Sequence, residues 1–383
     1  MMPLLQDRVV LVSGGTSGLG AAIARAAARE GALVAVTGRR REPGEALAAE
    51  LTAAGTKALF ILGAARIADE GIIAPARTLG HEVVAVAARD RTRAEAFAAG
   101  HGIATVHDSY AGVIADPGVD LVYNALVNSL HARWNIAALQ AGKHVLSEKP
   151  LTSNADQARA VRTATLASPG QVAEGFHYRH HPVNLRLGEL VTSGALGDIR
   201  RVDLVLTIPA PPDTDPRWSR ELAGGATMDL GCYVLDAARQ LGAWIGAAPR
   251  IVAADATLRA PELDASMRVE LGYPGGVTGH CTWDMDAADR IMAWTVTGTQ
   301  GTATSPAFAV PHTGNRLLVT RNGQTSQEVL GDQTSYTYQL ARLAGALQGG
   351  PPFPAGIDGS VANAELIDEC YRRVGLSPRG FLI

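Results

Sequence analysis

The feature that most constrains the fold is a regular alternation of short apolar runs and longer helical stretches between residues 57 and 176. Short apolar runs are typical of strands buried on both faces, and helices between them indicate parallel pairing. The runs are 57–62, 82–87, 120–125, 144–146 and 171–176. This order predicts an α/β domain built on a doubly wound parallel sheet.

After residue 180 the helices between the apolar runs largely disappear. Strands that follow one another directly are typical of antiparallel pairing. The expected strands are 199–209, 250–257, 266–271, 277–283, 293–298, 316–320 and 327–330, and helices follow at 335–347 and 359–373. We expect a C-terminal α+β domain with a large, mainly antiparallel sheet. Its exposed face is predicted to join copies of the chain into a homo-oligomer, a dimer or a tetramer.

Length and composition limit the class of protein. With 383 residues the chain is long enough for several domains, and we expect them at 1–56, 57–178 and 179–383. A net charge of −3 and an aromatic content of 5% argue against nucleic acid or a membrane surface as a partner. The three cysteines form no CxxC pair, and no apolar run reaches the roughly 18 residues of a membrane span. We therefore predict free thiols and a cytoplasmic location.

A Gly-rich turn at residues 13–20 stands near the start of the chain. It follows an apolar run at 8–12, and a helix to about residue 30 separates it from a second strand at 33–37. A further helix extends to about residue 54, which completes a βαβα unit. In such a unit the turn places a pyrophosphate at a helix N-terminus.

Up to about residue 56 the sequence resembles the short-chain dehydrogenase/reductase family. Gly14, Gly18 and Gly20 match its TGxxxGxG turn, with Ser13 in place of Thr. The catalytic Tyr-x-x-x-Lys of that family is absent, because none of the three lysines has Tyr four residues before it. We predict that residues 1–56 dock beside a complete sheet of the next domain, with their own dinucleotide site empty.

A second, less regular Gly-rich turn follows the strand at 57–62. Its sequence Gly63-x-Ala65-x-x-Ala68 is a degraded form of GxGxxG, and its place between a strand and a helix favours a Rossmann-type cofactor site. The second strand of this unit is followed by Arg where an acid would favour NAD, so we expect NADP, with NAD as the alternative. The cofactor contacts expected here are Gly63, Ala65, Arg66, Ile67 and Arg89.

Lysine is rare in this chain, which has only Lys57, Lys143 and Lys149. Lys149 precedes Pro150 at the end of an apolar run, and the proline restricts it to an extended conformation that aims its side chain. A lysine in a chain that otherwise uses arginine suits a tunable pKa or a point charge. Lys149 is therefore a candidate catalytic residue, the alternative being a surface lysine after a strand.

From residue 57 onward the chain resembles the glucose–fructose oxidoreductase/inositol dehydrogenase (Gfo/Idh/MocA) family. The resemblance rests on spaced motifs at 63–68, 124–131, 147–150, 176–182, 224–233 and 298–301. It implies a nicotinamide-dependent oxidoreductase with a Rossmann domain and a C-terminal substrate domain, acting on sugars, polyols or cyclic diols. By the same resemblance Lys149, Asp229 and Tyr233 are catalytic, and further cofactor contacts are Asn128, His131, Glu148 and Lys149.

The residue types fit hydride transfer. A carbonyl that accepts hydride gains negative charge on oxygen, which needs a proton donor or a cation within hydrogen-bond reach. Tyr233 stands where most of the family has His, and we expect the Lys149 ammonium to lower its pKa and favour the phenolate. Asp229 lies four residues before Tyr233, on the same helical face, and is expected to orient one of the two groups or the substrate.

Other polar residues after residue 173 offer weaker signals. Arg179 and His181 are predicted to line the substrate pocket, and Trp218 either stacks on a sugar face or belongs to the core. The spacing of Glu174 and the histidines of the 177–181 segment is not that of a metal site, so no metal is expected.

Two other functions stay open at this point. One is a regulator or degenerate enzyme that holds NADP without turnover, suggested by Ala65 and the additional N-terminal unit. The other is a short-chain-type reductase that uses the first Gly-rich turn, which the missing Tyr-x-x-x-Lys disfavours.

Overall fold

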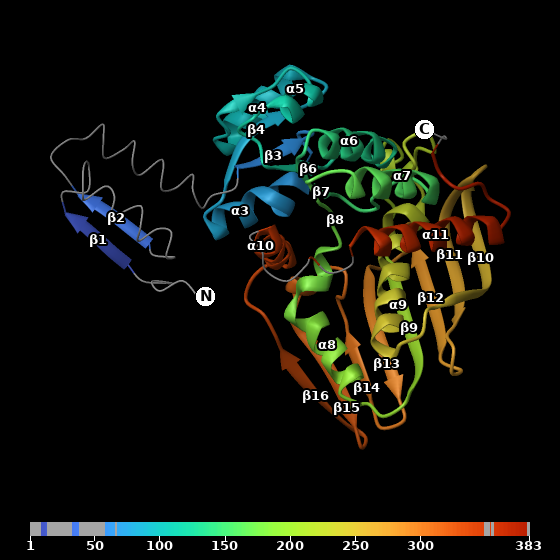
Figure 1. Cartoon of the computed structure of the whole chain (residues 1–383). Coiled ribbons are helices and arrows are strands. Elements are labelled where there is room, and N and C mark those ends of the chain that lie inside the picture. The colour runs from blue at the N-terminus through green and yellow to red at the C-terminus, as the bar shows by residue number, and fades with distance from the viewer. Residues whose placement is uncertain are drawn as a thin grey trace. The chain divides into compact units, whose positions relative to one another are not determined.

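The first 57 residues belong to a structural unit of their own. The computed structural model describes residues 9–13, 33–37, 58–65, 67–347, 353 and 356–380. Its contacts separate Met1–Lys57 with Gly80–Glu82 from Ala58–Leu79 with Val83–Ile383. In the first unit, β1 (Val9–Ser13) and β2 (Leu33–Thr37) form a parallel pair (Figure 1), which confirms both expected strands. The first Gly-rich turn and the two helices predicted there lie outside the described residues.

The second unit begins with the predicted parallel sheet. Its six strands have the order β5-β4-β3-β6-β7-β8, and none of the described strands of the first unit belongs to it. The strands are β3 (Ala58–Leu62), β4 (Glu82–Ala87), β5 (Thr105–Val106), β6 (Leu121–Asn124), β7 (His144–Ser147) and β8 (Val172–Glu174). The Rossmann-type doubly wound sheet is therefore confirmed.

The register of this sheet brings the candidate site residues to one edge. Asn124 lies opposite Leu62 on one side and Ser147 on the other, and Ser147 lies opposite Glu174. Four strands therefore end level with one another. Ligands of doubly wound sheets bind at this carboxyl edge.

Three helices of this part begin at side-chain caps. Asp90 accepts a hydrogen bond from the Arg93 N–H, and Ser109 and Asn154 each cap a helix in the same way. The helices are η1 (Asp69–Ile73), α3 (Ala74–Leu79), α4 (Arg91–His101), α5 (Tyr110–Ala115), α6 (Asn128–Gln140) and α7 (Ala155–Leu166).

The C-terminal part is built on a sheet of eight strands in the order β10-β11-β12-β9-β13-β14-β15-β16. The pair β9–β12 is parallel, and the other pairs are antiparallel, as predicted. The short β14 was not foreseen. The strands are β9 (Ile199–Thr207), β10 (Arg250–Ala260), β11 (Leu263–Gly272), β12 (Thr278–Asp284), β13 (Ile291–Gly298), β14 (Thr302–Ser305), β15 (Arg316–Arg321) and β16 (Gln324–Val329).

Helices cover one face of this sheet. Figure 1 shows α8 and α9 lying across it, and both contact its strands. The core contains the fully buried Trp283 and Trp294. The helices of this part are η2 (His177–His180), α8 (Pro182–Thr192), η3 (Pro216–Trp218), η4 (Thr227–Gly231), α9 (Cys232–Ile245), η5 (Pro311–Thr313), α10 (Ser335–Leu347) and α11 (Ile357–Arg373).

One glycine on the covered face fixes how closely a helix approaches the sheet. A Cβ on Gly231, at the end of η4, would lie 2.7 Å from the indole of Trp283. The missing side chain therefore lets η4 pack directly on β12. This packing sets the position of Asp229, which lies in the same turn. Among the described residues, no helix combines the length and apolar character needed to cross a membrane.

Candidate active site

Lys149 and Asp229 form an ion pair that joins the loop after β7 to η4. Lys149 follows β7, and its peptide bond to Pro150 is cis. Its ammonium Nζ donates to the carboxylate Oδ1 of Asp229 and to the Asp229 backbone carbonyl, both at 2.9 Å. The side chains are only 14% and 19% exposed, so the pair is shielded from most solvent. The two residues are therefore brought together as the sequence predicted.

A second cation holds the other oxygen of the Asp229 carboxylate. Arg217 of η3 lies 3.4 Å from Oδ2, a residue that the sequence had not pointed to. Burial raises the pKa of Asp229, but Lys149 and Arg217 outweigh it and lower that pKa below its usual value. Burial likewise lowers the pKa of Lys149, and the Asp229 carboxylate outweighs it and raises that pKa. Both members of the pair therefore stay charged at neutral pH.

Tyr233 lies in the first turn of α9, directly after η4. The Lys149 ammonium lies 4.9 Å from the centre of its ring, a cation–π contact. Its hydroxyl lies 3.1 Å from Nε2 of His177. Burial raises the pKa of Tyr233 well above its ordinary value. The expectation that Lys149 lowers this pKa is therefore wrong, because burial raises the pKa and the ammonium does not offset it. The Tyr233 hydroxyl therefore stays protonated at neutral pH.

The turn after β3 is shaped for close approach of a ligand. Gly63 has φ +90°, a conformation that favours glycine, and a Cβ there would lie 3.0 Å from the Leu126 side chain. Ala65 and Ile67 continue the turn and are half-buried, and Arg66 lies outside the described residues. This backbone fits the pyrophosphate of a dinucleotide at the carboxyl edge of the sheet.

Two arginines follow β4: Arg89 precedes α4, and Arg93 lies in its first turn. Arg89 is exposed. The guanidinium of Arg93 donates to the carbonyl of Ala64 at 2.7 Å, inside the Gly-rich turn. The sequence had not singled out Arg93, because it lies in a helix. Arg93 therefore brings a positive charge to the Gly-rich turn, while contact of Arg89 with a cofactor phosphate stays a prediction.

Three further side chains predicted to contact the cofactor form hydrogen bonds with other groups of the protein. The ring nitrogens of His131 lie 2.8 and 2.7 Å from the carbonyls of Leu126 and Pro150. Asn128 donates to the Ala223 carbonyl at 3.0 Å, and buried Glu148 accepts from Tyr123 at 2.6 Å. These bonds fix the loops at the carboxyl edge; direct contact of the three side chains with a cofactor stays a prediction.

Comparison with known proteins follows the same division of the chain. Residues 57–176 match the model of an oxidoreductase family with an NAD-binding Rossmann fold, and residues 184–304 match the GFO/IDH/MocA C-terminal domain. The NADP(+)-dependent D-xylose 1-dehydrogenase 2 of Haloferax volcanii is 34% identical over 81% of this chain and 95% of its own length. The chain belongs to the GFO/IDH/MocA oxidoreductase family.

Solved structures of GFO/IDH/MocA type agree with the fold. A 3-ketoreductase from Actinomadura kijaniata, solved with NADP and TDP-benzene, has a TM-score of 0.75 and 27% identity, covering 85% of this chain and all of its own. An aldose–aldose oxidoreductase from Caulobacter crescentus, solved with glycerol, has a TM-score of 0.77 and 25% identity, covering 84% of this chain and 98% of its own.

A short-chain dehydrogenase model matches residues 8–93. This match confirms the resemblance of the N-terminal residues to short-chain dehydrogenases. It extends beyond the expected 56 residues and also covers β3 and β4. These strands and the helices between them form a βαβ unit of the same kind, which accounts for the overlap with the GFO/IDH/MocA Rossmann match.

The three predicted substrate residues of this GFO/IDH/MocA protein make their contacts with residues other than Lys149 and Asp229. Arg179 makes two hydrogen bonds to Asp236. His181 is fully buried and accepts from the Val183 N–H, which caps α8. Trp218 is mostly buried, and the Arg259 guanidinium lies 4.3 Å from its ring centre. Of the two roles considered for Trp218, these contacts favour the core. Substrate contact of the three residues stays a prediction.

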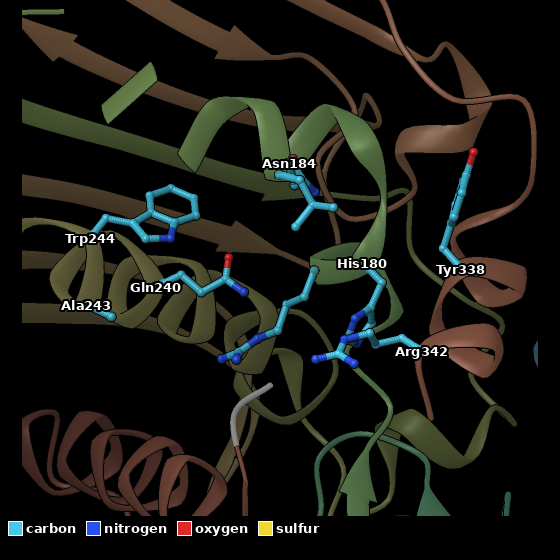
Figure 2. Close-up of a pocket in the computed structure, with 9 residues that line it drawn as sticks. His180, Asn184, Gln240, Ala243, Trp244, Tyr338 and Arg342 are labelled. Atoms are coloured by element: carbon cyan, nitrogen blue, oxygen red, sulfur yellow. The ribbon is translucent and has the colours of Figure 1, made fainter. Parts of the chain in front are cut away.

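A cavity of about 490 Å³ lies among η2, α8, α9 and α10 (Figure 2). Arg179 and His180 of η2 line it, and none of the proposed catalytic side chains does. The remaining lining residues come from α8, α9 and α10: Asn184, Leu185, Gln240, Ala243, Trp244, Tyr338 and Arg342. Within the described residues no cluster of three or more His, Cys, Asp or Glu side chains is arranged to hold a metal ion.

Proposed function

We propose that this oxidoreductase uses NADP(H) and transfers hydride between nicotinamide and a hydroxyl or carbonyl carbon of a sugar-like, polyol or cyclic diol substrate. The observation that carries the proposal is the convergence of Lys149, Asp229 and Tyr233 beside the carboxyl edge of the Rossmann sheet. A cation and a neutral hydroxyl in one shielded place are what a developing alkoxide needs.

Each of the three residues has a separate task in the proposal. The bound nicotinamide supplies or takes up the hydride. The Tyr233 hydroxyl gives its proton to the carbonyl oxygen in reduction and accepts the alcohol proton in oxidation. Lys149 stabilises negative charge on that oxygen, and Asp229 holds the ammonium charged and in place.

The choice of NADP rests on charge at the end of β4. Arg89 is exposed, and Arg93 is bound to the Gly-rich turn. Two guanidinium groups complement a 2′-phosphate better than a ribose hydroxyl, which an acid would bind. The similar xylose dehydrogenase and ketoreductase carry NADP in their names or structures, which supports the same choice.

A cofactor-reduction screen tests the proposed function. The full chain is mixed with D-xylose, other aldoses, inositols and trans-dihydrodiols, with NADP⁺ and NAD⁺ in parallel. We expect reduction of NADP⁺ by at least one compound and its loss in Lys149→Ala. Tight NADPH binding without turnover of any compound would instead favour the non-catalytic regulator.

We also propose that the uncovered face of the eight-stranded sheet is an interface between copies of the chain. Its central strands present small, half-exposed side chains, among them Val205, Ala293 and Thr295. A flat face of this kind suits close contact with a second copy. Light scattering after size exclusion is expected to give a dimer or a tetramer, and Val205→Glu is expected to shift it toward monomer.

A further inference from the structure

The hydroxyl of Tyr233 is the first member of a hydrogen-bonded row that leads away from the Lys149–Asp229 pair. It lies 3.1 Å from Nε2 of His177. Nδ1 of His177 lies 2.8 Å from Oγ of Ser335, and that oxygen lies 2.7 Å from Nδ1 of His312. The four side chains come from α9, η2, α10 and η5, so the row is made only by the tertiary fold.

The row leads from the site to the surface, because its first members are buried and its last member is partly exposed. His177 is 1% exposed and Ser335 is fully buried, whereas His312 is partly exposed. The ring of Tyr336 stacks on His177 with centroids 3.8 Å apart and fixes its plane. Lys149 offers no equivalent path, because Asp229 keeps it protonated.

The backbone determines the direction of the hydrogen bonds. The Ser335 N–H points at Nδ1 of His312, so this nitrogen is an acceptor. The Ser335 hydroxyl then donates to the same nitrogen, and its oxygen accepts from Nδ1–H of His177. Nε2 of His177 is thus left to accept from Tyr233. Burial lowers the pKa of His177 well below its ordinary value, in keeping with a neutral ring that takes a proton at one nitrogen while it releases one at the other.

We propose that His177, Ser335 and His312 form a proton relay between Tyr233 and solvent. In oxidation, Tyr233 accepts the substrate alcohol proton as its own proton moves to Nε2 of His177. Nδ1–H of His177 moves to Ser335, the Ser335 proton moves to Nδ1 of His312, and Nε2–H of His312 goes to water. Reduction starts from the arrangement that this outward transfer leaves, with Nε2–H of His177 facing Tyr233; each transfer is then reversed, and Tyr233 regains the proton it gave to the carbonyl. The relay rests on the role proposed above for Tyr233.

The two reaction directions give the relay a distinctive kinetic signature. In reduction the first turnover uses the proton already on Tyr233, and the relay is needed only afterwards. For Ser335→Ala we therefore expect a first turnover at the wild-type rate and a steady-state rate lowered roughly ten- to a hundredfold. In oxidation the first turnover itself is slowed. D-xylonolactone with NADPH and D-xylose with NADP⁺ are the first pair of probes, replaced by the pair that the screen selects. Ser326→Ala, a serine of β16, is the matched control.

A second variant covers the possibility that Ser335→Ala does not fold. His312→Ala removes the partly exposed end of the relay, and added imidazole is expected to restore its steady-state rate while leaving the wild type unchanged. An unchanged steady-state rate in both variants overturns the relay. So does a first turnover of reduction that is slowed as much as the steady state, because that marks a structural role.

Two further measurements separate the relay from the proposed function. Tyr233→Phe is expected to lose the first turnover in both directions. If this variant retains the first turnover, Tyr233 is not the proton donor, and both the proposed function of Tyr233 and the relay are ruled out. Nitrogen NMR of ¹⁵N-histidine-labelled protein, assigned with His177→Asn, tests the relay without substrate. It is expected to show His177 protonated at Nδ1, and protonation at Nε2 instead contradicts the hydrogen-bond order above.

Discussion

The candidate site has two halves that meet at the ring of Tyr233 and differ in how they handle charge. The charged half is Lys149, Asp229 and Arg217, in which two cations share one largely shielded carboxylate. The hydroxyl half is Tyr233, His177, Ser335 and His312, a row of neutral hydrogen-bonding groups. Neighbouring charges keep the first half ionised, whereas burial keeps Tyr233 protonated and His177 neutral.

Charge stabilisation and proton transfer are therefore assigned to separate groups within one site. A fixed ammonium stabilises an oxyanion only if it does not lose its proton, and Asp229 ensures this. A proton donor must be able to regain its proton, and a neutral row allows this without placing a second charge beside the ammonium. The following variants attack one half at a time.

Removal of the fixed charge is expected to have the largest effect. Lys149→Ala should lower kcat/KM about a thousandfold, because the developing alkoxide loses its cation in a shielded site. Steady-state kinetics with the substrate from the screen measures the loss. Lys143→Ala is the matched control, since Lys143 donates to the carbonyls of Asp116 and Val119, and it should stay within about twofold of wild type. Full turnover by Lys149→Ala would rule out the charged half as catalytic machinery.

Loss of the hydroxyl should rank second. Tyr233→Phe keeps the ring under the Lys149 ammonium and removes only the proton donor and its bond to His177. We expect kcat to fall about a hundredfold, with the free energy of unfolding reduced by only about 1 kcal/mol. A pair of assays, turnover and denaturant unfolding, separates the two effects. An unchanged kcat would move the proton donor to another group.

Weakening the ion pair should alter the pH dependence more than the rate. In Asp229→Asn the main contribution that raises the pKa of Lys149 is gone, and burial then lowers that pKa. The ammonium should therefore be lost at lower pH, so that kcat/KM falls on the alkaline side earlier than in wild type, with about a tenfold loss at neutral pH. Profiles of kcat/KM against pH for wild type, Asp229→Asn and the surface control Asp156→Asn test this. Identical alkaline limbs would contradict it.

The smallest expected effect on activity comes from the contact between η4, which carries Asp229, and Trp283 of β12. Gly231→Ala would place a Cβ 2.7 Å from the Trp283 indole and displace η4. Overpacking of this kind costs about 1–3 kcal/mol of the free energy of unfolding. Gly345→Ala in α10, where a Cβ meets nothing within 4 Å, should instead stabilise the protein slightly. If urea unfolding gives both variants the same stability, η4 does not depend on this contact.

Sequence periodicity predicted both sheets because their patterns are local. The runs now seen as β3, β4, β6 and β7 are short and apolar, and the helices between them require parallel pairing. The parallel pair β9–β12 joins strands more than 70 residues apart, a pairing that no local pattern encodes. The strand β14 has only 4 residues, too few to show the alternation of apolar and polar side chains that predicts a strand.

Lys149, Asp229 and Tyr233 were predictable from the sequence, whereas Arg217 and the partners of the Tyr233 hydroxyl were not. Lys149 and Asp229 stood out through scarcity, a Pro neighbour and motifs shared with a family. The partners of Tyr233 are 56 residues before it, in the case of His177, and about a hundred after it, in the case of Ser335. Serine and histidine occur in many places in a chain, so only the fold shows which of them meet. The direction of the pKa shift of Tyr233 was mistaken for the same reason, since it depends on burial and on where the ammonium points.

Direct titration of Lys149 tests the central claim, a permanently charged ammonium beside a neutral tyrosine. The chain has only three lysines, so ¹³C-lysine labelling gives a simple NMR spectrum, and Lys149→Ala identifies the signal of Lys149. We predict that this signal titrates above the ordinary lysine pKa of about 10.4 or not at all before the protein unfolds. A midpoint near neutrality would contradict the account.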